Sequence, residues 1–197
     1  MFLRNRTTLV LVVLACFILS ANLTSAQSKQ GMPGMKMVER GRYLTTVGGC
    51  NDCHSPKVFT QEGPVPDTTR LLSGHPADMT LPKLPDGIVG MSPDTWGAIT
   101  TGDLTAWTGP WGTSFTANLT PDKETGIGSW TEEMFIKALR TGKHMGTGRD
   151  ILPPMPWQEF GAMTDADMKA VFAYLKSLKP ISNAVPDPIP PKAPPKQ

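Results

Sequence analysis

Two cysteines and a histidine occupy residues 50–54, in the order Cys-Asn-Asp-Cys-His. Thiols three positions apart can each add to one of the two vinyl groups of a haem, and the adjacent histidine can then bind the iron from one face of the ring. The spacing suits a rigid macrocycle, because both sulfurs must reach neighbouring edges of it from one short turn. The motif predicts one covalent haem c attached at Cys50 and Cys53, with His54 as an axial iron ligand.

Two other chemistries use a C-x-x-C pair, namely a redox dithiol and half of a zinc site. Zinc would need two more Cys or His ligands at matching spacing, but His75 and His144 stand alone and Cys16 lies in an apolar N-terminal segment. A thioredoxin-type motif would open a helix after a buried strand, and that context does not occur. A haem-free dithiol or metal-binding module is therefore the minor alternative.

The N-terminus has the pattern of a secretory signal peptide. Arg4 and Arg6 precede the apolar run 9–19, and the small residues 24–26 offer a cleavage site before Gln27. The run is short for a membrane span, which needs about 20 apolar residues. We expect a periplasmic or otherwise exported protein, with an uncleaved anchor facing the periplasm or a lipoprotein modified at Cys16 as the alternatives.

Removal of residues 1–26 takes away two arginines and no acidic residue, so 17 basic residues face 17 acidic ones. A neutral chain has no strong global field to steer a highly charged partner. A nucleic-acid partner is accordingly not expected, because such binding needs a basic surface.

The helical pattern is concentrated near the two ends of the remaining chain. A first helix is predicted over 37–47, stopped by two glycines. A second starts at Ser129, where Ser129 and Glu132 match a capping box, and stops at Gly142. A third starts at Thr164, carries an apolar stripe and ends at 179–180.

Between these helices, residues 55–128 are rich in turn-forming Gly and Pro, and a loop of this length is either functional or disordered. Ordered coil wrapped over the haem, with one short helix near 93–101, is favoured by the spread of Trp96, Trp107, Trp111 and Phe115 along this stretch. A pair of short strands around 99–115 is the weaker prediction. With 19 Gly and 20 Pro in 197 residues, much of the chain must be loop.

The predicted domains are a signal peptide (1–26), a flexible lead (27–36), a haem domain (37–179) and a Pro-rich extended tail (180–197). Just before the last helix, Pro153, Pro154 and Pro156 stiffen the backbone around Met155. A thioether on a stiff support suits a second axial ligand. From the residues alone Met145, Met163 and His144 are rivals, since methionine is also an ordinary core residue.

The motif at 50–54 preceded by Gly-Arg-Tyr-Leu (41–44), the segment Pro-Pro-Met-Pro-Trp (153–157), and the residues 163–165 leading into 173–178 resemble a single-haem bacterial cytochrome c of the class I fold. The resemblance covers about residues 37–179. It implies an all-α domain of about four helices around one covalent haem with long irregular loops. The long stretch 55–128 departs from the small members of the family.

The resemblance also implies residue roles: thioether links at Cys50 and Cys53, His54 as proximal ligand and Met155 as distal ligand. It implies that the first and last helices cross, with Gly41 packed against the Tyr174 region. A proline carbonyl in the family orients the proximal histidine, and Pro64 and Pro66 are both candidates here.

A ligand set of His and Met fills both axial positions, which predicts single-electron transfer to and from other redox proteins and no substrate chemistry. The partners expected are redox donors and acceptors, including a membrane-associated dehydrogenase or oxidase of which the chain would be the haem subunit. The alternative is a haem enzyme or gas sensor with a labile distal site.

Overall fold

A computed structural model describes residues 37–191. The predicted signal peptide, the lead and the last six residues of the predicted tail lie outside the described residues. The elements in chain order are α2 (Met37–Val47), α3 (Cys50–His54), β1 (Lys57–Thr60), β2 (Gly63–Pro66), β3 (Ile99–Thr100), β4 (Ala106–Gly109), β5 (Gly112–Phe115), α4 (Glu132–Thr141), the 3₁₀ turn η1 (His144–Gly146), α5 (Trp157–Gly161) and α6 (Asp165–Ser177).

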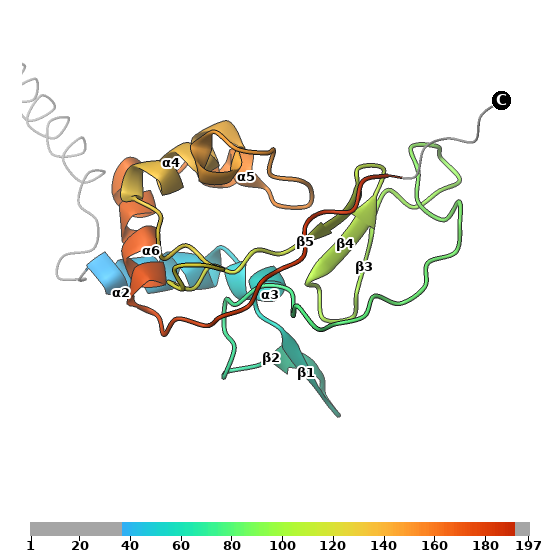
Figure 1. The fold of residues 1–197 in the computed structure, drawn as a ribbon, viewed down its shortest axis with the longest axis horizontal. Helices are drawn as coiled ribbons and strands as arrows, with labels where there is room; N and C mark the ends of the chain where they lie inside the picture. Colours follow the sequence, from blue (N-terminus) through green and yellow to red (C-terminus); the bar gives the residue numbers. More distant parts are fainter. Residues whose placement is uncertain (1–36, 192–197) are drawn as a thin grey trace, which may run out of the picture. The chain divides into compact units, whose positions relative to one another are not determined.

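Helix α2 has the predicted bounds, and it crosses α6 (Figure 1). Gly41 permits this crossing, because a Cβ atom there would lie 1.8 Å from the carbonyl oxygen of Ala170 and 2.8 Å from Cβ of Tyr174. The packing role that the resemblance implied for Gly41 is thus confirmed. The core around the helices contains Leu72, Ile127, Phe135, Phe172 and Leu175.

Two of the predicted helix caps agree with the structure and one does not. The hydroxyl of Thr164 accepts the amide of Asp167 at the start of α6, as predicted, and Gly142 ends α4 in the left-handed conformation. The predicted start of α4 at Ser129 is wrong. The hydroxyl of Thr131 accepts the amide of Met134 instead, so the helix begins after Thr131. Ser129 and Thr131 both carry a hydroxyl that could cap the helix. Thr131 has the extended backbone typical of an N-cap residue, and its hydroxyl reaches the amide of Met134 in the first turn of α4.

The prediction of an all-α fold is only partly correct, because residues 57–115 also form two small antiparallel sheets. In the first, β1 pairs with β2 and Thr60 lies opposite Gly63. In the second, β4 pairs with β3 and β5, and Gly109 lies opposite Gly112. Two-residue loops close both hairpins, and such tight connections are the commonest ones between antiparallel strands.

The predicted helix near 93–101 is wrong. Ser92 and Thr95 close a single turn, in which the amide of Thr95 donates to the carbonyl of Ser92 over 3.1 Å. Trp96 then forms an isolated parallel bridge with Val89, because the amide of Trp96 donates to Ile88 and the amide of Gly90 donates to Trp96. A pairing of this kind depends on residues several positions away, which helical spacing within the segment does not reveal.

The described part of the Pro-rich tail, residues 180–191, is extended and forms no helix. It runs from the end of α6 to β5 (Figure 1), where Ile189 and Thr113 exchange two backbone hydrogen bonds of 2.8 and 2.9 Å. None of the helices within 37–191 is long and apolar enough to cross a membrane.

Candidate haem-attachment site

The Cys-Asn-Asp-Cys-His motif forms the one-turn helix α3. Gly49 precedes it with a positive φ of 66°, a conformation that costs glycine little and lets the chain turn directly from α2 into α3. Cys50 and Cys53 stand three positions apart and therefore lie on the same side of the turn. Both thiols are free and partly buried. The local fold thus presents two sulfurs side by side, as attachment to one ring edge requires.

The electrostatics of the two thiols disfavour a redox dithiol. Burial raises the pKa of Cys50 to about 11, and burial followed by the charge of Asp52 also raises the pKa of Cys53. Reactive and zinc-binding cysteines act as thiolates and have a lowered pKa. The raised pKa values are the opposite of what a reactive dithiol or a zinc site would show.

His54 ends α3 and is buried. Its Nδ1 atom lies 2.8 Å from the carbonyl oxygen of Ala117, which can only accept, so Nδ1 carries the proton. The lone pair of the imidazole is then on Nε2, as an axial ligand requires. Burial lowers the pKa of His54, which keeps the ring neutral and able to coordinate.

The expectation that a proline carbonyl holds this histidine is wrong. Pro64 and Pro66 lie in strand β2, whereas Ala117 follows strand β5, 63 positions after His54. A non-proline carbonyl serves equally well, since only the oxygen takes part in the hydrogen bond. The inserted sheets bring this later segment to the histidine.

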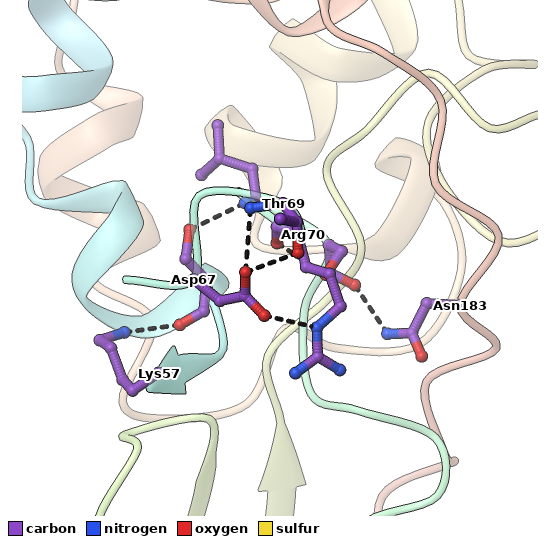
Figure 2. Close-up of polar contacts among 8 residues, drawn as sticks. Lys57, Asp67, Thr69, Arg70 and Asn183 are labelled. Atoms are coloured by element: carbon purple, nitrogen blue, oxygen red, sulfur yellow. Dashed lines mark hydrogen bonds and ion pairs between the residues drawn. The ribbon is translucent and has the colours of Figure 1, made fainter. Parts of the chain in front are cut away.

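Sequence reasoning missed Lys57, which lies shortly after the histidine. Its ammonium donates to the carbonyls of Asn51 (3.1 Å), Asp52 (2.9 Å) and Ser55 (2.5 Å). Figure 2 shows the last of these bonds. Carbonyls at a helix C-terminus attract cations, so a lysine just beyond a one-turn helix was an available signal. Lys57 therefore fixes the end of the helix that carries both cysteines.

The segment around Met155 lies between η1 and α5, and Met155 itself is partly buried. It is held from two sides. The amide of Trp157 donates to the carbonyl of Met155 over 2.9 Å, and the hydroxyl of Ser114 donates to the carbonyl of Pro153 over 2.5 Å. Strand β5 thus contacts the methionine loop through Ser114 and leads directly to Ala117, which contacts His54.

The rival ligands lie in η1 and just after α5. His144 is exposed and packs edge-on against Trp130, with ring centroids 5.1 Å apart. Met145 lies within η1 with a positive φ of 54°, and Met163 follows α5. The axial role of Met155 stays a prediction, as do the roles of Cys50, Cys53 and His54.

The donor set fits a covalent haem. It offers two neutral thiols on one side of a helical turn and, next to them, a buried imidazole whose Nδ1 proton is engaged and whose Nε2 is free to ligate. The thioether of Met155, on a proline-rich loop, would supply a soft second ligand of the kind that raises a haem potential.

No known family model matches the chain. Among curated proteins it is 32% identical to a subunit of the nicotinate dehydrogenase of Pseudomonas putida over 150 residues, which are 76% of this chain and 9% of that protein. It is 30% identical to the gluconate 2-dehydrogenase cytochrome c subunit of Pantoea cypripedii over 75% of this chain and 25% of the relative.

The chain is also 42% identical, over 81 residues, to the cytochrome c subunit of the quinone alcohol dehydrogenase of Gluconobacter oxydans. This shorter match covers 40% of this chain and 17% of that protein. The chain therefore spans a quarter or less of the length of these relatives. The similarity to cytochrome c subunits of dehydrogenases supports its assignment as a c-type cytochrome.

Proposed function

We propose that this chain is an exported, single-haem cytochrome c of class I type that transfers electrons as the haem subunit of a dehydrogenase or as a carrier between redox proteins. Cys50 and Cys53 form the thioether links, and His54 and Met155 are the axial ligands. The bound haem supplies reversible one-electron chemistry. The similarity to cytochrome subunits of dehydrogenases supports the partner class.

The observation that carries the proposal is the hydrogen bond between Nδ1 of His54 and the carbonyl of Ala117. It fixes the tautomer that leaves Nε2 for iron, and it does so beside two un-ionised thiols. A structural histidine would equally satisfy a carbonyl, but it would not need a preceding Cys-x-x-Cys turn on the same short helix.

The protein's own residues would hold this haem in two ways. The thiols of α3 would fix one edge of the ring, and the imidazole of His54 and the thioether of Met155 would bind the iron in both oxidation states. A ligand set that does not change keeps reorganisation small and leaves no open position for a substrate. Export fits the proposal because the N-terminal sequence has the signal-peptide pattern and covalent haem is attached outside the bacterial cytoplasm.

The test is the absorption spectrum of the exported protein, oxidised and reduced, together with its intact mass. The mass should exceed that of the polypeptide by one haem that survives denaturation, and Cys50→Ala with Cys53→Ala should abolish this increment. The weak near-infrared sulfur-to-iron band should be present in wild type and absent in Met155→Ala, with the covalent haem retained.

Met163→Ala is the matched control, because it removes another partly buried methionine and should leave the band intact. A mass without haem would contradict the proposal as a whole. Covalent haem without the sulfur band in wild type would contradict the His/Met ligation and would point to the haem enzyme or gas sensor.

A further inference from the structure

The C-terminal tail makes side-chain contacts at the segments that hold His54. Asn183 is the centre of these contacts. Its Nδ2 donates to the carbonyls of Ser73 and His75, each over 2.8 Å, and its Oδ1 accepts the amide of Ala77 over 3.0 Å. The three backbone groups that it binds all belong to one short stretch of chain, so Asn183 fixes the path of the segment 73–77.

The segment 72–75 in turn holds the haem-attachment helix. The amide of Gly74 donates to the carbonyl of His54 over 2.8 Å, and the amide of Leu72 donates to the hydroxyl of Ser55 over 2.8 Å. Figure 2 shows Asn183 reaching this segment beside the turn in which Arg70 pairs with Asp67. The tail therefore reaches the main chain of His54 through a single intervening segment.

The same segment also supports the side chain of His54. The amide of His75 donates to Thr116 and the amide of Leu119 donates to Leu72, so the segments 72–75 and 116–119 are paired on either side of Ala117. A second tail contact reinforces the pair, because Nδ2 of Asn118 donates to the carbonyl of Ile181 over 2.8 Å. Ala117, whose carbonyl binds Nδ1 of His54, thus lies between hydrogen-bonded segments that the tail also contacts. We call the paired segments 72–75 and 116–119 the frame of His54.

We propose that Asn183 is a positioning residue for the proximal histidine. Its three hydrogen bonds set the frame that holds the carbonyl of Ala117 against Nδ1 of His54, and so tune the haem iron from the C-terminal tail. This inference rests on the proposed function. It makes residues 181–183 of the tail part of the support of the haem site and not only an extended end of the chain.

The physical consequence concerns the reduction potential. A hydrogen bond from Nδ1 to a carbonyl makes the imidazole a stronger donor, which favours the oxidised iron. Loosening the frame weakens this bond and should favour the reduced iron. A residue that only adds stability would change the unfolding midpoint without changing the potential.

The experiment compares the haem-loaded variants Asn183→Ala and Ser182→Ala with wild type. Asn183→Ala removes all three bonds, whereas Ser182→Ala alters the neighbouring exposed residue and leaves them in place. We expect a more positive midpoint potential and displaced haem-methyl NMR signals in oxidised Asn183→Ala, and wild-type values in Ser182→Ala. Protein truncated after Ala184 keeps Asn183 but loses the Ile189 contact, and it should also keep the wild-type potential.

Asn183→Gln keeps a neutral amide but lengthens the side chain by one methylene, so it displaces all three bonds without adding a charge and supplies a milder test should the alanine variant yield little folded protein. Wild-type potential and NMR signals in both Asn183 variants would overturn the inference, even if their unfolding temperature fell. Wild-type protein without haem or without the sulfur band would instead contradict the proposed function, so the two failures are distinguishable.

Discussion

The hydroxyl of Ser114 donates a 2.5 Å hydrogen bond to the carbonyl oxygen of Pro153, although the two residues are 39 positions apart. Ser114 is buried in strand β5, and Pro153 lies just before Met155. Shortly after Ser114, the carbonyl of Ala117 binds His54. One short stretch of chain therefore contacts both the histidine segment and the methionine segment.

Ser114→Ala should loosen the methionine loop. The lost hydrogen bond is worth about 1 kcal/mol, and its loss leaves the carbonyl of Pro153 without this donor. In haem-loaded protein we expect the sulfur-to-iron band to disappear at a lower temperature than in wild type. Ser177→Ala is the control, because its exposed hydroxyl bonds only within α6. Equal melting of the band in both variants would disprove the link.

Lys57→Met should weaken the attachment helix and lower the reduction potential. The ammonium satisfies three carbonyls at the end of α3, and a hydrogen bond to a charged group contributes about 1.5–3 kcal/mol when it is well shielded from water. Loss of a cation near the haem also favours the oxidised iron. Chemical denaturation measures the loss of stability, and redox titration measures the change in potential. Lys169→Met is the control, because it removes a half-exposed lysine that pairs with Glu132. An unchanged potential would mean that Lys57 acts on stability alone.

Gly41→Ala should disrupt the crossing of α2 and α6. The added methyl would overlap the carbonyl oxygen of Ala170, and overpacking of this kind costs about 1–3 kcal/mol or more. Gly97→Ala is a matched control, since a Cβ atom there meets no atom within 4 Å. Thermal unfolding should show a clear loss of stability for the first variant and a change within about 0.5 kcal/mol for the second. Equal midpoints would show that the helices can separate without cost.

The sequence predicted features that depend on neighbouring residues. The bounds of α2, the Thr164 cap and the Gly142 stop follow from helix propensity and capping within a few positions. The resemblance added the contact of Gly41, which depends on a helix near the other end of the chain. Among the capping signals, local rules were insufficient where two hydroxyls competed, at Ser129 and Thr131.

Features that depend on distant pairing were not predictable in the same way. Gly and Pro indicate turns, but they do not say which strands a turn joins, so β4 and β5 were only a weak prediction. The carbonyl of Ala117 carries no residue-specific signal, since every residue has one. The contacts of Asn183 were hidden for a related reason: proline content predicts an extended chain without indicating what it runs along.

Acid should destabilise the protein through His75. This residue is fully buried, its Nδ1 lies 2.7 Å from the hydroxyl of Thr105, and that hydroxyl donates to Asp103 over 2.7 Å. Burial lowers the pKa of His75 below its ordinary 6.5, although the charge of Asp103 acts in the opposite direction. Phe115, the aromatic ring packed against it, is uncharged.

Because the unfolded chain binds this proton at a higher pH than the folded protein does, the contribution of His75 is fully present above pH 6.5 and is lost as the pH falls below it. The slope for one proton is at most about 1.4 kcal/mol per pH unit. Urea unfolding of haem-loaded protein between pH 7 and pH 5 should therefore show a steeper loss of stability in wild type than in His75→Gln. Parallel slopes would mean that His75 keeps an ordinary pKa in the folded protein, and that the charge of Asp103 compensates its burial.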